Sequence, residues 1–160
     1  MNLKLLCVAC AVSILFAVSA AAAESPRWLL IDSSPESDFL YDTLGTKNLG
    51  DGIVAVTVKV SYSPEGRQET LTLLKNDKRY TDLAYTLYSY DLNCSMRMER
   101  LHRVVHIDSK GAQIIEFNLA GKTEWEETPP GTRMDLVIDQ ACSPGRESPA
   151  VPEPSAPAAK

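Results

Sequence analysis

The alternation of residue types between Tyr88 and Met98 restricts what this chain can fold into more than any other stretch. Every second side chain there is apolar or aromatic, and the residues between them are polar. The apolar set is Tyr88, Tyr90, Leu92, Cys94, Met96 and Met98. A period of two is typical of a β-strand with one buried and one wet face. We expect this strand to continue to Ile107, turn at 108–111 and return through 115–119 as a hairpin.

The alternation changes phase inside this long arm. Apolar residues occupy even positions up to Met98, but from Leu101 onward Val105 and Ile107 occupy odd positions. A regular strand cannot exchange its two faces without an extra residue. The sequence therefore predicts a β-bulge or a sharp bend near Glu99–Leu101.

Other strands and two helices are expected around the hairpin. The β-branched run 53–62 predicts a strand, and shorter apolar runs predict strands at 28–31 and 39–41. Ser63 followed by Pro64 is a helix start, so we expect a helix over 68–79.

Thr132 is the expected N-cap of a second helix, with Asp135 as its capping-box partner. Its inward face is Met134, Val137, Ile138 and Ala141. We expect this helix to end at Cys142.

Residues 1–23 have the layout of a secretory signal peptide. A basic start precedes the apolar run 5–18, and Ala21–Ala23 supply the small residues of a cleavage site before Glu24. This run is shorter than the roughly 20 residues that a membrane-spanning helix needs. We therefore expect export, to the periplasm or the cell surface, and no integral span after cleavage.

Export decides how the cysteines are interpreted. Cys7 and Cys10 lie in the removed segment, and neither follows a good lipoprotein-type box. Cys94 and Cys142 remain, and an even count in an exported chain predicts a disulfide, with two free thiols as the alternative. Its loop would contribute roughly 4 kcal/mol in the chain-entropy model.

Composition completes the domain layout. We expect one α+β domain at 24–142: an antiparallel sheet of about five to six strands, two helices and one disulfide. Residues 143–160 are rich in Pro and Ala and predict a disordered tail. With 16 basic and 21 acidic residues the chain is acidic, which argues against nucleic acid as a partner.

Several landmarks in one order resemble the surface-adhesin protein E-like family of Gram-negative bacteria over residues 28–142. They are Trp28, Tyr41-Asp42, the strand ending at Tyr62, Asp91-Leu92-Asn93-Cys94, the turn 108–111, Trp125, Pro129-Pro130-Gly131-Thr132 and Cys142. The resemblance implies an antiparallel sheet packed with helices and the disulfide. The family's namesake is an outer-membrane lipoprotein that binds host matrix and plasma proteins, which implies an adhesin-like role.

Three groups of residues have the composition of a site. His102 and His106, near Glu99, have a spacing that holds zinc on a helix, but on a strand they would be roughly 13 Å apart, so we expect no metal. Trp125 lies among three acids, where we expect the ring to close the core and the acids to face water. These acids are Glu124, Glu126 and Glu127. The cluster of Tyr85, Tyr88 and Tyr90 is either core packing, which we favour, or a stacking platform for sugar or peptide.

No Ser-His-Asp pattern, Gly-rich phosphate loop or nucleophilic cysteine occurs in the mature sequence, so we expect neither an enzyme nor a cofactor. Our hypothesis is an exported, non-enzymatic domain of the bacterial envelope. It would bind a protein or envelope component through an open sheet edge or the outer face of the hairpin. The alternatives are a periplasmic small-ligand carrier or enzyme, and a structural envelope protein whose tail acts as a spacer.

Overall fold

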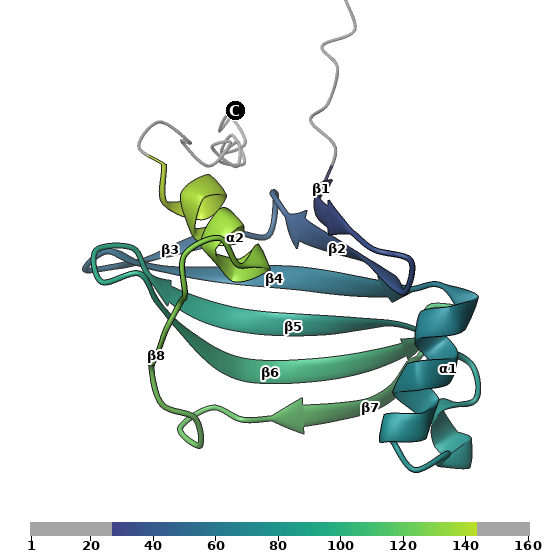
Figure 1. Cartoon of the computed structure of the whole chain (residues 1–160). Helices are drawn as coiled ribbons and strands as arrows, with labels where there is room; N and C mark the ends of the chain where they lie inside the picture. The colour runs from purple at the N-terminus through teal and green to yellow at the C-terminus, as the bar shows by residue number, and fades with distance from the viewer. Residues whose placement is uncertain (1–26, 144–160) are drawn as a thin grey trace, which may run out of the picture.

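The fold is described by a computed structural model that covers residues 27–143 (Figure 1). The predicted signal peptide and the predicted tail after Ser143 lie outside the described residues. In chain order the elements are β1 (Trp28–Ser33), β2 (Ser37–Asp42), β3 (Lys47–Gly50), β4 (Ile53–Tyr62), α1 (Pro64–Leu73), the short 3-10 helix η1 (Lys78–Tyr80), β5 (Leu83–Asn93), β6 (Met98–Asp108), β7 (Gln113–Asn118), β8 (Glu126–Glu127) and α2 (Arg133–Cys142).

All strands join one antiparallel sheet. Its order is β1-β2-β4-β5-β6-β7, with β3 paired to β4 and β8 paired to β6, which makes eight strands within residues 27–143. The expected α+β class with two helices is correct, but the expected five to six strands are too few. The additional strands are short: β3 and β8 pair with the ends of β4 and β6 that β2 and β7 leave unpaired.

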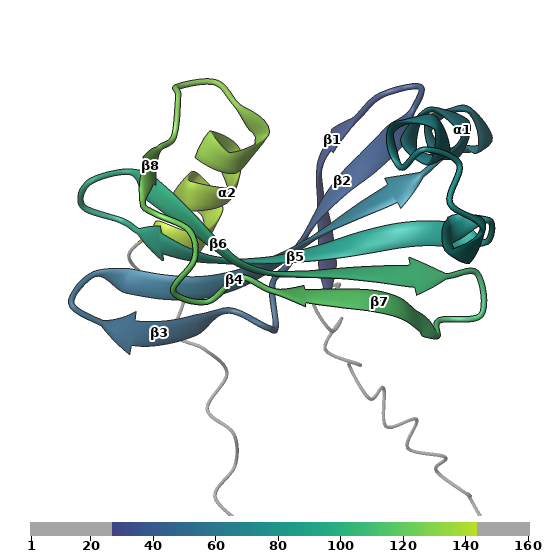
Figure 2. The same ribbon diagram turned by 90° about the horizontal axis from the view of Figure 1, so that it is seen from below.

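The two helices lie on the same side of the sheet (Figure 2). We call this side the helical face and the opposite side the open face. Among the described residues, no helix covers the open face. Strand alternation assigns the side chains: Val56, Val58 and Leu92 point to the helical face, whereas Lys59 and Asp91 point to the open face.

The core lies between α2 and the helical face. Its fully or nearly buried members are Phe39, Tyr41, Val56, Val58, Leu92, Val137 and Ile138. From Val56 to Val60 the valines of β4 alternate with Thr57 and Lys59, so this part of the strand contributes to the core on one face and stays polar on the other. Burial of each such side chain contributes roughly 1.5–3 kcal/mol.

The central hairpin differs from its prediction. β5 ends at Asn93, and the chain reverses at 94–97 instead of continuing as one arm through Met98. The Asn93 side chain accepts a hydrogen bond from the Met96 amide at 3.0 Å, and Arg97 has a positive φ of 51°. The alternation concealed this turn because Met96 continues the apolar pattern while its side chain is 64% exposed.

The predicted change of phase is real and lies next to the expected position. Ser89 pairs with Arg103 and Tyr90 with Leu101, so His102 is an additional residue in β6. After this β-bulge Val104 and His106 lie on the helical face, whereas Val105 and Ile107 pair with Leu87 and Tyr85 on the open face. The predicted turn at 108–111 is also present, because Asp108 Oδ1 accepts hydrogen bonds from the amides of Lys110 and Ala112 at 2.9 and 2.8 Å.

The predicted starts of both helices are correct. Ser63 accepts a hydrogen bond from the Gly66 amide at 3.1 Å, and Thr132 accepts one from the Asp135 amide at 3.2 Å. The first helix is shorter than predicted, since left-handed backbone at Lys75 follows its end. Within residues 27–143, no helix is long and apolar enough to cross a bilayer.

Candidate binding surface

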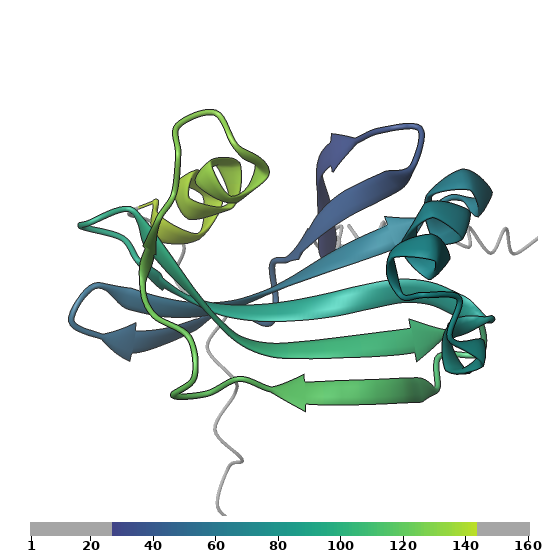
Figure 3. The same cartoon turned by 60° about the horizontal axis from the view of Figure 1, so that its bottom comes forward.

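The middle of the helical face is lined by aromatic side chains of β5 and β7. This region lies between the two helices (Figure 3). Helix α2 is bonded to Cys94, just after Leu92 at one end of β5, and α1 lies near the other end, past Thr86. Tyr88 and Tyr90 alternate on β5 and stack with ring centroids 6.5 Å apart. Both are partly buried, and Phe117 of β7 is 41% exposed. We call Tyr88, Tyr90 and Phe117 the aromatic surface.

A buried polar chain supports the α1 side of this surface. The Tyr62 hydroxyl is hydrogen-bonded to Thr86 Oγ1 at 3.0 Å, and Thr86 Oγ1 is hydrogen-bonded to His106 Nδ1 at 2.8 Å. Tyr80 and Phe117 both pack edge-on against the imidazole, with centroids 5.2 and 5.9 Å from its own. Burial lowers the pKa of His106. The neutral ring therefore acts as a spacer that fixes Phe117.

The tyrosines stay neutral at physiological pH. Burial raises the pKa of Tyr90 to about 12, and the charges of Glu99 and Glu126 add to the rise. Burial also raises the pKa of Tyr88, with smaller contributions from Tyr62 and Tyr90. The aromatic surface therefore offers ring faces and hydroxyl donors without negative charge of its own.

Glu99 borders the aromatic surface beside Tyr90. Burial raises the pKa of this carboxyl, opposed by a hydrogen bond that Thr128 Oγ1 donates at 3.4 Å. Glu126 on β8 is exposed and raises the pKa of Glu99 slightly further. This side of the surface is therefore acidic.

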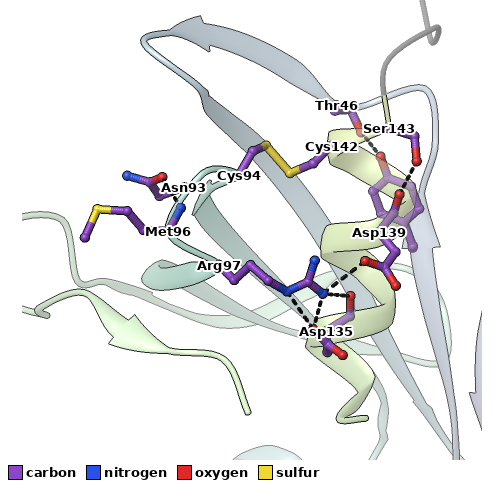
Figure 4. The surroundings of a disulfide bond; sticks show 10 residues. Thr46, Asn93, Cys94, Met96, Arg97, Asp135, Asp139, Cys142 and Ser143 are labelled. Atoms are coloured by element: carbon purple, nitrogen blue, oxygen red, sulfur yellow. Dashed lines mark hydrogen bonds and ion pairs between the residues drawn. A yellow bond between two sulfur atoms is a disulfide. The ribbon is translucent and has the colours of Figure 1, made fainter. Parts of the chain in front are cut away.

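The helix α2 is held rigidly at the other end (Figure 4). The predicted disulfide is present, joining Cys94 in the β5–β6 turn to Cys142 at the end of α2. The Arg97 guanidinium donates hydrogen bonds to Asp135 and to Asp139, the latter at 3.0 Å. Arg133 Nε also donates to Asp32 of β1 at 2.6 Å. These ties connect α2 to two separate parts of the sheet.

Beside the aromatic surface, β7 forms an open edge of the sheet. The amide of Leu119, just after β7, donates a hydrogen bond to the His102 carbonyl at 2.8 Å. In this register the amides of the odd-numbered residues of β7 also form their hydrogen bonds with β6. The register then points the amides of Glu116 and Asn118 away from the sheet. An edge of this kind can receive an extended strand of another molecule.

The two histidines lie on opposite faces. His106 points to the helical face, whereas the bulge turns His102 to the open face, where its Nδ1 is 3.4 Å from Asp91 Oδ1. Glu99 lies on the helical face opposite Leu92. The structure thus does not bring the three residues together. Within residues 27–143, no group of three or more His, Cys, Asp or Glu side chains is placed to hold a metal ion.

The other predicted candidates divide between the faces. Tyr85 pairs with Ser61 and points to the open face, so it is separate from Tyr88 and Tyr90. We expected the Trp125 ring to close the core, but it lies outside the core cluster. It packs instead against Arg100, whose guanidinium lies 4.6 Å from the ring centroid. The three acids around Trp125 are exposed, as expected.

Sequence reasoning missed the contribution of Phe117 and the polar chain behind it. Phe117 was placed only as part of a return strand. The available signal was its alternation with Glu116 and Asn118 in a strand at the end of the chain's hairpins, where an edge strand is expected.

The sequence matches no protein-family model and no curated protein. Among solved structures, the chain is similar to Haemophilus influenzae protein E in its crystal form II, with a TM-score of 0.50 and 16% identity over 74% of this chain and 88% of that chain. At this level of identity the similarity concerns the fold. The resemblance to a protein E-like family thus extends to the arrangement of strands and helices.

Proposed function

We propose that this chain is an exported, non-enzymatic domain that binds a protein partner in or outside the bacterial envelope. The partner contacts the aromatic surface and adds a strand to β7. The main support is the position of Phe117, which is partly exposed on the open edge strand and lies in one row of the helical face with Tyr88, with Val104 of β6 between them. Aromatic residues are enriched at protein interfaces because their rings give large contact areas with few rotatable bonds.

The chemistry of the surface supports binding over catalysis. His106 is 8% exposed, and its Nδ1 is already hydrogen-bonded to Thr86, so this nitrogen is unavailable to a substrate. The tyrosine hydroxyls have raised pKa values, which disfavours the deprotonated form that a general base requires. The disulfide and the sequence pattern of residues 1–23 support export.

Site-specific photocrosslinking in the native cell envelope tests this function. A benzophenone amino acid replaces Phe117 in one variant and Leu49 in a control, because Leu49 is 56% exposed on β3 at the other edge. We expect a protein adduct at position 117 that excess unlabelled domain suppresses, and none at position 49. Equal adducts at both positions, or no adduct at position 117, would contradict the proposal.

A further inference from the structure

The open face carries a lysine between two aromatic rings. Lys59, in the middle of β4, has its Nζ 4.4 Å from the centroid of the Trp28 ring and 5.6 Å from that of Tyr85. The three residues come from β1, β4 and β5, and the register turns all of them to the open face. No helix of the described chain covers them (Figure 2).

The ammonium group has no carboxylate of its own. Among the described residues, no ion pair or hydrogen bond is formed by the Lys59 side chain. The nearby acid Asp42 is 3% exposed and is taken by Arg27, whose Nη2 donates to Oδ2 at 2.9 Å. Asp42 Oδ1 also accepts hydrogen bonds from the amides of Leu44 and Gly45 at 3.2 and 3.0 Å.

This neighbourhood is positive on an otherwise acidic protein. Arg27 and Lys59 provide two cations against the single carboxylate of Asp42, while the chain carries a net charge of −5. Burial, and next the charge of Arg27, lower the pKa of Lys59, so its ammonium is incompletely hydrated. A lysine that only covered apolar surface with its stem would place its charge fully in water.

We propose that Trp28, Lys59 and Tyr85 form a binding site for an acidic sugar. Both rings now carry the Lys59 ammonium, and Trp28 also carries the Arg27 guanidinium, with Cζ 5.5 Å from the ring centroid. The carboxylate of the sugar accepts hydrogen bonds from the Lys59 ammonium and draws it off the rings, so that the apolar faces of the sugar can pack on Trp28 and Tyr85. The two flanking rings favour a saccharide over an acidic peptide, since an isolated carboxylate side chain would use only the ammonium. This site is on the face opposite the aromatic surface and does not depend on the proposed function.

Calorimetric titration of the folded, oxidised domain tests the site. The probes are trigalacturonate, the neutral galactotriose as a matched sugar, and a short polyglutamate peptide as a matched anion. We expect heat of binding with trigalacturonate alone, weakening as salt is added because the charges are near the surface. Absence of binding to trigalacturonate, or binding of polyglutamate with equal affinity, would overturn the proposal.

Variants assign the binding to Lys59. Lys59→Met keeps the aliphatic stem and removes the charge, and we expect trigalacturonate to bind about tenfold more weakly or not at all. Lys78→Met removes an exposed lysine of η1 and the same net charge, and should leave binding unchanged. Thermal melts establish that both variants are folded. Equal affinity of the two variants would show that the sugar binds elsewhere and would refute the assignment.

Discussion

At the scale of the residue, His106 makes the stability of the domain beneath the aromatic surface depend on pH. Its ring lies between Tyr80 and Phe117, and its Nδ1 bonds to Thr86, which is fully buried. Burial lowers its pKa below the usual value of about 6.5. The unfolded chain therefore binds a proton more readily than the folded chain does. The stability that the neutral ring provides is complete above about pH 6.5 and is lost as pH falls below it.

We expect the free energy of unfolding to decrease between about pH 6.5 and pH 5, by at most about 1.4 kcal/mol per pH unit for this one proton. His106→Gln should flatten this part of the profile, as measured by urea denaturation at each pH. His102→Gln is the matched control, because the His102 side chain is 30% exposed. A profile that stays as steep in His106→Gln as in the wild type would show that other groups cause the dependence.

At the scale of the element, α1 depends on one glycine. Glycine lowers helix propensity, so Gly66 in the first turn of α1 is unfavourable by local sequence alone. The structure gives the reason for its presence: a Cβ at Gly66 would lie 1.9 Å from the backbone carbonyl oxygen of Glu36. The helix thus packs its first turn directly on the β1–β2 turn, a contact between distant segments that no local pattern can reveal.

Gly66→Ala should therefore destabilise the domain by about 1–3 kcal/mol through overpacking. In an unconstrained helix the same change would stabilise by about 0.5–1 kcal/mol, so even the sign of the effect is diagnostic. Glu69→Ala, at an exposed position of the same helix, serves as the control and should change stability by less than about 0.5 kcal/mol. Thermal and urea denaturation measure both, and a stabilised Gly66→Ala would contradict the close contact.

The helix α2 is the element that the disulfide secures. Cys94 and Cys142 are 48 residues apart in sequence, so the double variant Cys94→Ser/Cys142→Ser should lose roughly 4 kcal/mol of unfolding free energy. Urea denaturation measures this loss, and reduction of the wild type should reproduce it. The double variant should still give the crosslink at position 117 under conditions where it is folded. Loss of the crosslink from a folded variant would indicate a direct role of the disulfide.

At the scale of the molecule, sequence reasoning predicted what local patterns encode. The strand of 53–62, both helix caps, the turn at 108–111 and the disulfide follow from alternation, capping chemistry and cysteine count. The reversal at 94–97 was missed because Met96 keeps the apolar phase through an exposed turn. The site was harder to foresee, since the contacts of Phe117 with His106 and of Lys59 with Trp28 depend on which strands become neighbours.

Strand addition at β7 is a property of the assembled sheet and can be separated from side-chain contact. The amide of Glu116 points away from β6, so proline at this position removes a donor from the open edge without breaking the β6–β7 ladder. Glu116→Ala is the matched control, because both variants remove the ion pair with Arg103, in which Nε and Oε1 are 2.7 Å apart. We expect Glu116→Pro to be within about 1 kcal/mol of Glu116→Ala in stability.

In the photocrosslinking experiment at position 117, Glu116→Pro should reduce the yield of the protein adduct severalfold, whereas Glu116→Ala should retain it. The reason is that an added strand needs the outward amides of β7 in addition to the aromatic side chains. Equal yields from the two variants would show that the partner uses the aromatic surface alone. The β7 edge would then be left without a role in binding, and the proposed interface would be confined to the face between α1 and α2.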